Sequence, residues 1–275
     1  MNYKLIASDL DGTLLYDVFT VSEENFKAIE KYKAMGGQLV PTSGRCFFEI
    51  PESLRKCKDL SYCVSSNGAV ITELATGRRD EVLIPLDKYD RIMELGKEYD
   101  TYPSIHFDGY GYILKIDDDR EKAYSYNLNS DYFSHYHRWC KKPESWDGVF
   151  EGSQGVEMIS LFFKTQKALD ECVEKLNALG GLVVTSSAPF NIEIIAEGAT
   201  KGDGIRRLAK KLGISIEQVI AVGDSPNDMA MLSAAGLPLA VENADNSLKA
   251  MAKKIICNHK EHIVPYILEN IIEEI

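Results

Sequence analysis

The sequence predicts an α/β fold, a doubly wound parallel sheet that carries an inserted α+β unit. Three observations support it. A short apolar run near the N-terminus leads into an acidic loop, strand-like and helix-like segments then alternate, and this alternation stops for about 110 residues before it resumes. The predicted core therefore comprises residues 1–83 and 197–275, and the predicted insertion, a cap, comprises residues 84–196.

Composition narrows the class of protein. The chain has 275 residues, with 31 Lys+Arg against 42 Asp+Glu, so its net charge is −11. We expect no nucleic-acid partner, because phosphate backbones bind clustered cations and this chain has no Lys/Arg-rich run. Its apolar runs fall short of the ~20 residues that span a membrane. The six cysteines form no CxxC pair, which favours reduced thiols. We expect a cytoplasmic protein, a monomer or a small homo-oligomer.

The helices and strands of the core are predicted from apolar runs and from the polar, Gly and Pro residues that end them. Residues 4–8 form a short apolar run that ends at Asp9, as a buried parallel strand does. Ser22 is a helix cap, and Gly36 and Gly37 close that helix. Further segments predict a strand at 38–41, a helix at 45–57 interrupted by Pro51, and strands at 61–65 and 69–72 around an Asn-Gly turn.

The insertion has a different pattern, because its strands and helices do not alternate strictly. Its predicted elements are a helix at 88–99, strands within 104–116, a strand at 158–164, a helix at 167–179, and strands at 182–185 and 192–195. Alternation then returns, with helices at 203–212, 228–235 and 247–254 and strands at 219–222 and 237–241.

Two acidic loops follow predicted buried strands of the core. Asp9 and Asp11 come directly after the first strand, and alternate residues of an extended segment face the same side. Asp224 and Asp228 follow the strand at 219–222. The carboxyl ends of parallel strands are where open α/β sheets bind ligands. The four carboxylates therefore predict a Mg²⁺ site with a nucleophile or proton donor beside it. The alternative is a pair of polar turns that cap helices.

Two further polar positions lie at the starts of predicted helices. Ser43 ends the second strand, where a hydroxyl and backbone N–H groups can hold phosphate oxygens. Lys201 stands where the chain re-enters the core and offers a fixed positive charge. An isolated lysine is more often a solvated surface residue.

The four segments together resemble the motifs of the haloacid dehalogenase superfamily. In chain order these are DLDGT at 9–13, TSGR at 42–45, Lys-Gly at 201–202 and GDSPND at 223–228. Their spacing is similar to that of the Cof-type subfamily, as are NGA at 67–69 and NA at 243–244. The resemblance covers the whole chain, although the cap matches by position and length only. One departure is Ser43, where the family commonly has Thr.

The resemblance implies a Rossmann-like core with a cap and a Mg²⁺-dependent phosphatase of small phosphorylated metabolites, such as sugar phosphates. Asp9 would be the nucleophile and form an aspartyl-phosphate, and Asp11 would be the general acid and base. The implied metal ligands are Asp9, the backbone carbonyl of Asp11, Asp224 and Asp228. The implied phosphate-binding residues are Ser43, Gly44, Lys201 and Asn227.

Other functions remain open at this stage. Asp11 argues against a dehalogenase, because related dehalogenases lack an acid at that position. A phosphomutase, a receiver-like phosphoacceptor and a non-catalytic regulator that binds a phosphometabolite are the alternatives. Receiver domains are about half this length and lack both DLDGT and a cap.

The insertion contains three further sequence features: a His/Cys group, a cluster of aromatic residues and an acidic run. His135, His137 and Cys140 could form a metal site if the stretch is extended, but a surface or pocket-lining role is favoured. Six aromatic residues crowd positions 124–139 and favour a small core over stacking on a substrate. The run Asp117–Asp119 is predicted to be a solvated turn.

Overall fold

The computed structural model describes residues 2–272, except for the side chain of Tyr132. The chain forms two compact units, one of residues 1–45, 50–80 and 200–275 and one of residues 46–49 and 81–199. We call them the core unit and the cap unit. The chain passes between them at 80/81 and 199/200, each three residues from the predicted boundaries at 83/84 and 196/197. The short segment 46–49 belongs to the cap unit, which the sequence analysis did not anticipate.

A five-stranded parallel sheet forms the centre of the core unit. Its order is β15 (Lys254–Ile255), β14 (Leu237–Ala240), β13 (Val219–Gly223), β1 (Leu5–Ser8) and β2 (Gln38–Pro41). Ser8 of β1 lies opposite Pro41 of β2 and Val222 of β13. The three strands therefore end at the same edge of the sheet, and the loops that follow them meet there. The predicted doubly wound α/β fold is confirmed.

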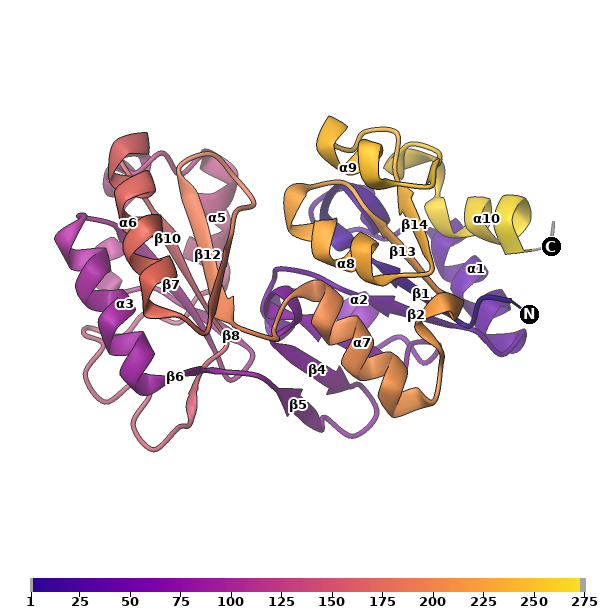
Figure 1. Ribbon diagram of the computed structural model, residues 1–275, viewed down its shortest axis with the longest axis horizontal. Helices are drawn as coiled ribbons and strands as arrows, with labels where there is room; N and C mark the ends of the chain where they lie inside the picture. Colours follow the sequence, from indigo (N-terminus) through magenta and orange to yellow (C-terminus); the bar gives the residue numbers. More distant parts are fainter. Residues whose placement is uncertain (1, 273–275) are drawn as a thin grey trace. The chain divides into compact units, whose positions relative to one another are not determined.

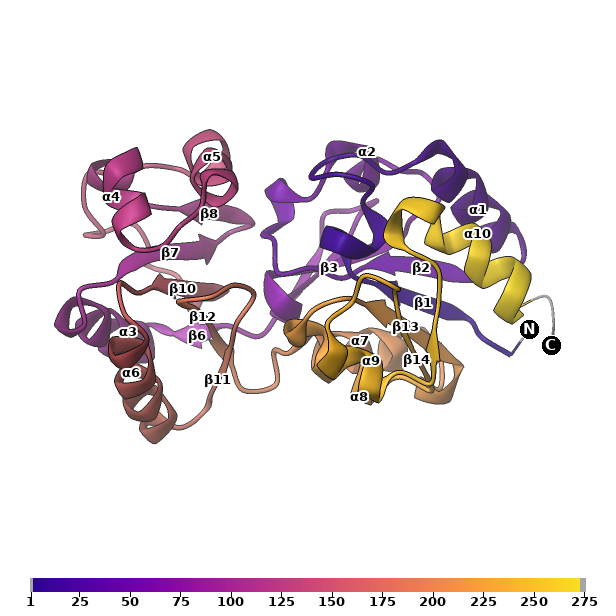
Figure 2. The same ribbon diagram turned by 90° about the horizontal axis from the view of Figure 1, so that it is seen from above.

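Helices cover both faces of this sheet (Figures 1 and 2). α1 and α10 lie on one face, and α7, α8 and α9 lie on the other. Their bounds are Glu23–Ala34, Ile263–Ile267, Lys201–Leu212, Met229–Ala234 and Asn246–Met251. α1 begins as expected, because the Ser22 hydroxyl accepts a hydrogen bond from the backbone N–H of Asn25.

The predicted helix at 45–57 is mostly wrong. The structure has a three-residue 3₁₀ turn, Phe47–Glu49, and the short helix α2, Glu52–Arg55. Pro51 lacks a backbone N–H and disfavours a helical conformation at Ile50, so the two pieces cannot join.

A hairpin follows. β3 (Tyr62–Ser65) pairs antiparallel with β4 (Val70–Glu73), and β5 (Arg79–Glu81) lies beside β4. The predicted Asn-Gly turn connects the two strands, and both Ser66 and Asn67 have positive φ there, at 50° and 56°. Thr42 forms a parallel bridge with Val64, so this turn lies next to the end of β2.

The cap unit is built on an antiparallel sheet of order β11-β12-β10-β7-β8. These strands are Leu182–Thr185, Asn191–Ala196, Met158–Phe162, Tyr102–Phe107 and Tyr110–Tyr112. α3 (Leu86–Glu98) and α6 (Gln166–Leu179) lie on one face, and α4 (Arg120–Ser125) and α5 (Ser130–Trp139) lie on the other (Figure 2). A two-stranded pair of β6 (Ile84–Pro85) and β9 (Gly155–Val156) completes the unit.

His135 and His137 lie on the helix α5, so the extended conformation that a metal site at 135–140 required is not formed. In α5 the residues i and i+2 do not share a face. His135 pairs with Glu49 at 3.3 Å, whereas His137 pairs with Asp118 at 2.8 Å. Tyr126, Phe133 and Tyr136 are buried in the apolar cluster of this unit, which confirms the core reading for these three. Tyr124 and Trp139 are partly exposed, and the Tyr132 side chain lies outside the described part of the chain.

The acidic run at 117–119 differs from the prediction of a solvated turn. Asp117 is buried and forms an ion pair with Lys122 at 2.5 Å, and the Asp119 carboxylate caps α4 by accepting a hydrogen bond from Lys122 N.

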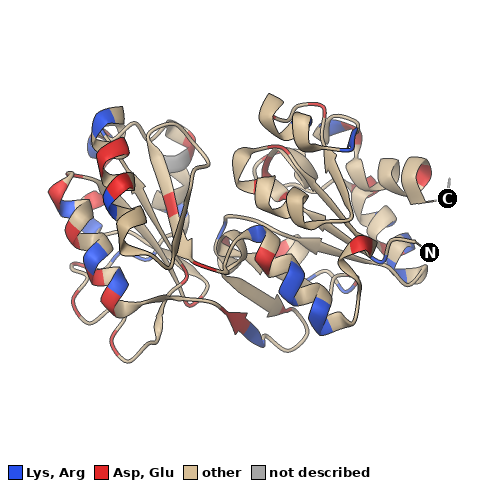
Figure 3. Ribbon diagram, viewed as in Figure 1, with Lys and Arg blue, Asp and Glu red and all other residues tan. Residues whose placement is uncertain are grey.

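Charged residues lie on the helices and loops of each unit more than on its sheet (Figure 3). Acidic and basic residues are interspersed along α3 and α6, basic residues prevail along α7, and the sheet strands carry few charged residues. Within the described residues, the helices are all too short or too polar to cross a lipid bilayer.

Candidate active site

Asp9 lies at the end of β1, where the backbone leaves the sheet. Its N–H donates to the carbonyl of Val222 at 3.0 Å, which extends the pairing of β1 with β13 by one residue. The side chain is only 6 % exposed. The chain can turn sharply just after it because Gly12 adopts a φ of +71°, a conformation that costs little only for glycine.

Three carboxylates from two loops meet at this edge. One oxygen from each of Asp9, Asp224 and Asp228 lies within 4.8 Å of the others. A Cβ at Gly12 would lie 2.6 Å from an oxygen of Asp224, so the two loops approach each other closely only because residue 12 has no side chain. Hard divalent cations prefer such a set of oxygen ligands.

Lys201 lies among these carboxylates. Its Nζ is 2.7 Å from Oδ1 of Asp9 and 2.6 Å from Oδ1 of Asp228, and its side chain is 1 % exposed. The lysine reaches this position from the first residue of α7, which the Thr200 cap fixes: Thr200 accepts from Asp203 N at 3.1 Å. The alternative of a solvated surface lysine is therefore wrong.

The carboxylates of Asp9, Asp224 and Asp228 repel one another, which contributes to the raised pKa values of Asp9 and Asp224. Burial, together with Asp228, raises the pKa of Asp9 well above its usual value, although Lys201 opposes this. Burial and Asp228 also raise the pKa of Asp224, to about 7. Burial alone would lower the pKa of Lys201, but Asp228 and Asp9 outweigh it and raise that pKa. Three buried or half-buried carboxylates thus face one ammonium group, and an added cation would relieve their repulsion.

The loop after β13 orients its own carboxylates. Oδ2 of Asp228 accepts hydrogen bonds from the backbone N–H groups of Asp224 at 3.0 Å and of Ser225 at 3.2 Å. The Thr13 hydroxyl donates to Oδ1 of Asp224 at 3.1 Å. Asp228 therefore both caps its loop and faces Lys201, so its capping role does not exclude the predicted role as a metal ligand, which stays a prediction.

Asp11 points away from this cluster toward Arg45. Nε of Arg45 donates to Oδ2 of Asp11 at 2.9 Å, and a terminal guanidinium nitrogen lies 2.5 Å from Oδ1. The Asp11 side chain is 56 % exposed, and that of Arg45 is 9 % exposed. A two-point contact of this kind fixes the carboxylate plane as well as its position. Sequence analysis named the TSGR segment but gave Arg45 no role.

Ser43 and Gly44 lie at the end of β2, beside the turn at 66–68. Ser43 is buried, and its backbone N–H donates to the carbonyl of Val64 at 2.9 Å. A Cβ at Gly44 would lie 3.0 Å from Oδ1 of Asn67. Nδ2 of Asn227 lies 3.5 Å from that same oxygen. The structure thus gathers Ser43, Gly44 and Asn227 around a buried asparagine in a left-handed conformation.

The structure brings the predicted residues together in two groups. Asp9, Lys201, Asp224 and Asp228 form one network, and Ser43, Gly44 and Asn227 lie along the neighbouring loops, while Asp11 is held apart by Arg45. Four supporting contacts escaped sequence analysis, those of Thr13, Arg45, Asn67 and Asn243. Nδ2 of Asn243 donates to the Gly12 carbonyl at 2.8 Å. Their positions in or beside the quoted motifs were the available signal.

Comparisons with known proteins identify the family of the chain. The family model described as haloacid dehalogenase-like hydrolase matches residues 6–268. The phosphatase YwpJ of Bacillus subtilis is 30 % identical over 288 residues, with 98 % of this chain and 100 % of that protein covered. The 5-amino-6-(5-phospho-D-ribitylamino)uracil phosphatase YcsE of B. subtilis is 28 % identical over 255 residues, with 93 % of this chain and 90 % of that protein covered. The solved structure of a haloacid dehalogenase-like hydrolase from B. subtilis superposes with a TM-score of 0.80 at 28 % identity and covers 98 % of this chain and 99 % of that one.

An α/β core with an acidic cluster and a buried lysine at the strand ends defines a hydrolase of the phosphoryl-transfer kind. The chain belongs to the haloacid dehalogenase-like hydrolase family. The resemblance in the motifs and the prediction of a phosphatase are both confirmed.

Proposed function

We propose that this protein hydrolyses a small phosphomonoester in a Mg²⁺-dependent reaction, with Asp9 as the nucleophile. One observation carries the proposal. Asp9 is buried at the end of β1, within 4.8 Å of Asp224 and Asp228 and 2.7 Å from the Lys201 ammonium. Such an arrangement supplies a nucleophile and the positive charge that a transferring phosphoryl group needs.

The donor set fits Mg²⁺. Asp9, Asp224 and Asp228 offer only oxygen ligands, and the raised pKa values of Asp9 and Asp224 reflect repulsion that a divalent cation would remove. We further propose the backbone carbonyl of Asp11 as a ligand. The bound ion would neutralise charge on the phosphoryl oxygens and so explain how a chain of net charge −11 accepts an anion.

In the first step a carboxylate oxygen of Asp9 attacks phosphorus, and the bond from phosphorus to the ester oxygen breaks. Asp11 gives its proton to the leaving alcohol. The product is an aspartyl-phosphate on Asp9, which divides one difficult displacement into two easier ones.

In the second step Asp11 takes a proton from water while the water oxygen attacks phosphorus. The bond between phosphorus and Asp9 breaks, and inorganic phosphate leaves. Arg45 supports both roles of Asp11, because its two hydrogen bonds set the direction of that carboxylate. Ser43, Gly44, Lys201 and Asn227 are the groups we propose to hold the phosphoryl oxygens.

The name of one relative supports a proposal for the substrate class. YcsE is named for a uracil compound that carries a phosphorylated ribityl group. We therefore propose a sugar or polyol phosphate of metabolic size for this chain, and we propose that residues of the cap unit select it.

A panel assay tests the proposal. Purified protein is incubated with sugar, polyol and nucleotide phosphates and p-nitrophenyl phosphate, with Mg²⁺ or with EDTA, and released phosphate is measured. We expect release that requires Mg²⁺ and is lost in Asp9→Asn. Asp90→Asn, an exposed carboxylate on α3, is the control and should retain activity. Release that persists in Asp9→Asn, or in EDTA, would exclude this mechanism.

A further inference from the structure

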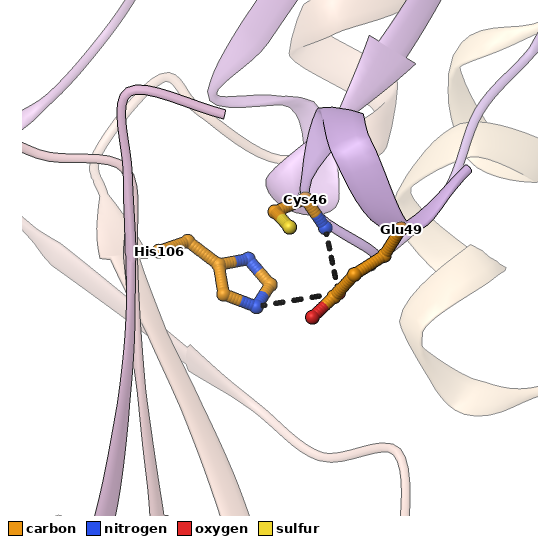
Figure 4. Close-up of side chains that lie close together, drawn as sticks. All are labelled: Cys46, Glu49 and His106. Atoms are coloured by element: carbon orange, nitrogen blue, oxygen red, sulfur yellow. Dashed lines mark hydrogen bonds and ion pairs between the residues drawn. The ribbon is translucent and has the colours of Figure 1, made fainter. Parts of the chain in front are cut away.

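A second group of potential metal ligands lies wholly within the cap unit and has no role in the proposed reaction. Cys46 and Glu49 come from the segment 46–49, and His106 comes from β7. The Cys46 thiol, the Glu49 carboxylate and the His106 imidazole point toward one another (Figure 4). One donor atom from each lies within 4.8 Å of the others.

The cluster is buried. Cys46 is 0 % exposed, and the side chains of Glu49 and His106 are 4 % and 6 % exposed. Oε2 of Glu49 accepts a hydrogen bond from the Cys46 backbone N–H at 3.2 Å and lies 4.0 Å from Nε2 of His106. Its other oxygen, Oε1, lies 3.3 Å from Nε2 of His135 on α5. A buried carboxylate is stable only when hydrogen-bond donors, positive charges or a metal ion compensate its charge.

The backbone around the cluster leaves room for it. A Cβ at Gly111 of β8 would lie 2.8 Å from Oε1 of Glu49 and 2.9 Å from the Sγ of Cys140. A glycine at this position therefore lets the carboxylate and a second thiol approach the sheet from the same side. The segment itself is fixed to the sheet, because the backbone N–H of Phe48 donates to the carbonyl of Gly109 at 2.9 Å.

We propose that Cys46, Glu49 and His106 bind a divalent transition-metal ion of the Zn²⁺ class. Thiolate sulfur, imidazole nitrogen and carboxylate oxygen are the three donor types that zinc combines in proteins. Ligands at ~2.0–2.3 Å from a tetrahedral centre lie roughly 3.3–3.8 Å apart, so a closure of about 1 Å brings the three donors to bonding distance. The Cys46 thiol proton passes to solvent when the sulfur–metal bond forms.

His135 acts as a positioning residue, because it contacts Oε1 of Glu49, whereas His106 is paired with Oε2. Metal-bound carboxylates and imidazoles are commonly held by such outer partners. The ion would tie the segment 46–49, which directly follows Arg45, to β7 within the cap unit.

Sulfur separates this site from the acidic cluster of the core unit. Asp9, Asp224 and Asp228 offer only oxygen, which suits Mg²⁺, whereas a thiolate donor selects softer ions. A cobalt–sulfur or zinc–sulfur signal can therefore come only from a cysteine site, even when the core unit also binds the added metal.

Full-length reduced protein is titrated with Co²⁺ in excess Mg²⁺, and the sulfur-to-cobalt charge-transfer absorption is recorded. We expect about one equivalent of Co²⁺ to produce this band. We expect the band to be lost in Cys46→Ala and in His106→Gln, and to be displaced by Zn²⁺. Cys172→Ala is the matched control, because Cys172 is equally buried in the same unit but lies on α6, and this variant should keep the band. Absence of the band in wild type, or its persistence in Cys46→Ala, would overturn the proposal.

A second measurement needs no variant and so does not depend on how the substitutions fold. The wild-type protein is loaded with one equivalent of Zn²⁺ in excess Mg²⁺, and its zinc-edge X-ray absorption is recorded. We expect a sulfur shell near ~2.3 Å together with a nitrogen and oxygen shell near ~2.0–2.1 Å. A spectrum with nitrogen and oxygen neighbours alone would contradict the site.

Discussion

Arg45 holds Asp11 through both carboxylate oxygens, with distances of 2.9 Å from Nε and 2.5 Å from a terminal nitrogen. The two residues are separated by 34 positions in the chain and come from the loops after β1 and β2. The contact aims a carboxylate that is otherwise more than half exposed. It gives the proposed acid and base a defined direction in the absence of substrate.

The first prediction concerns this pair. Arg45→Ala should lower kcat about 10- to 100-fold, because the proton donor loses its alignment. Arg45→Lys should recover only part of the loss, since an ammonium cannot make the planar two-point contact. Arg45→Ala should also lower the Tm, because the Arg45 side chain is 9 % exposed and donates to the Val18 carbonyl at 2.7 Å as well. The values of kcat are therefore compared well below the Tm of each variant. Equal activity of Arg45→Ala and wild type would remove Arg45 from the mechanism.

Lys201 offers a test of stability as well as activity. Lys201→Met should abolish turnover and, in EDTA, reduce the free energy of unfolding by about 3–5 kcal/mol, because Asp9 and Asp228 remain buried without their counter-ion. Urea unfolding measures this change. Added Mg²⁺ should restore part of the stability but none of the turnover. A variant as stable in EDTA as the wild type would show that the three groups are not coupled.

The close approach at Gly12 predicts a specific difference between two glycines. Gly12 and Gly77 both have a φ of +71°, but a Cβ at Gly77 meets nothing within 4 Å, whereas one at Gly12 meets Asp224 at 2.6 Å. Both alanine variants should therefore carry the same backbone strain of ~1–2 kcal/mol. Only Gly12→Ala should also lower Mg²⁺ affinity, by about 10- to 100-fold, because it displaces Asp224. Calorimetric titration with Mg²⁺ checks this. Equal affinities in the two variants would contradict the proposed role of Asp224.

The crowded carboxylates predict how pH and metal act together. A carboxyl group whose pKa is higher in the folded chain than in the unfolded chain favours folding most at low pH, and that contribution is lost as pH rises through the folded-state pKa. For Asp224 the window runs from 3.8 to about 7, and the direction is the same for Asp9. In EDTA this stabilising contribution to the Tm should therefore be lost by about pH 8. At that pH the carboxylates are ionised, and Mg²⁺ binds them best.

The difference in Tm between Mg²⁺ and EDTA is the readout for that prediction, since it cancels the titration of groups far from the cluster. It should be small at about pH 5 and larger at about pH 8. Asp224→Asn removes one of the titrating groups and should flatten this dependence. A constant difference across the range would mean that the metal binds elsewhere.

Local patterns sufficed to predict β1, β2, β13 and β14 of the parallel sheet and the acidic loops at its edge, whereas β15 was missed because a helix was predicted to continue to residue 254. Asp9 and Asp224 each follow a short buried strand, and strand order alone then places their loops together. The contact between Arg45 and Asp11 could not be predicted in this way, because it depends on the direction of two loops relative to each other. The helix α5 was not recognised because its aromatic residues have modest helix propensity, although Phe133 and Tyr136 lie at helical spacing. The cysteine and histidine cluster was invisible for a similar reason: Cys46 and His106 are 60 positions apart (106 − 46), and no spacing rule joins them.

In the proposed reaction Asp9 carries the phosphoryl group between the two steps, and chemical trapping can detect the group on that residue. Asp11→Asn should slow the second step, because water loses its general base. This variant is mixed with p-nitrophenyl phosphate, because p-nitrophenolate leaves without a proton from Asp11 and the first step can still proceed. The reaction is quenched and reduced with borohydride, which converts an aspartyl-phosphate to homoserine, and the peptides are mapped by mass spectrometry. We expect homoserine at position 9, none at position 11, and none in Asp9→Asn. Turnover in the wild type without any modification at position 9 in the quenched variant, or trapping at another carboxylate, would contradict this role of Asp9.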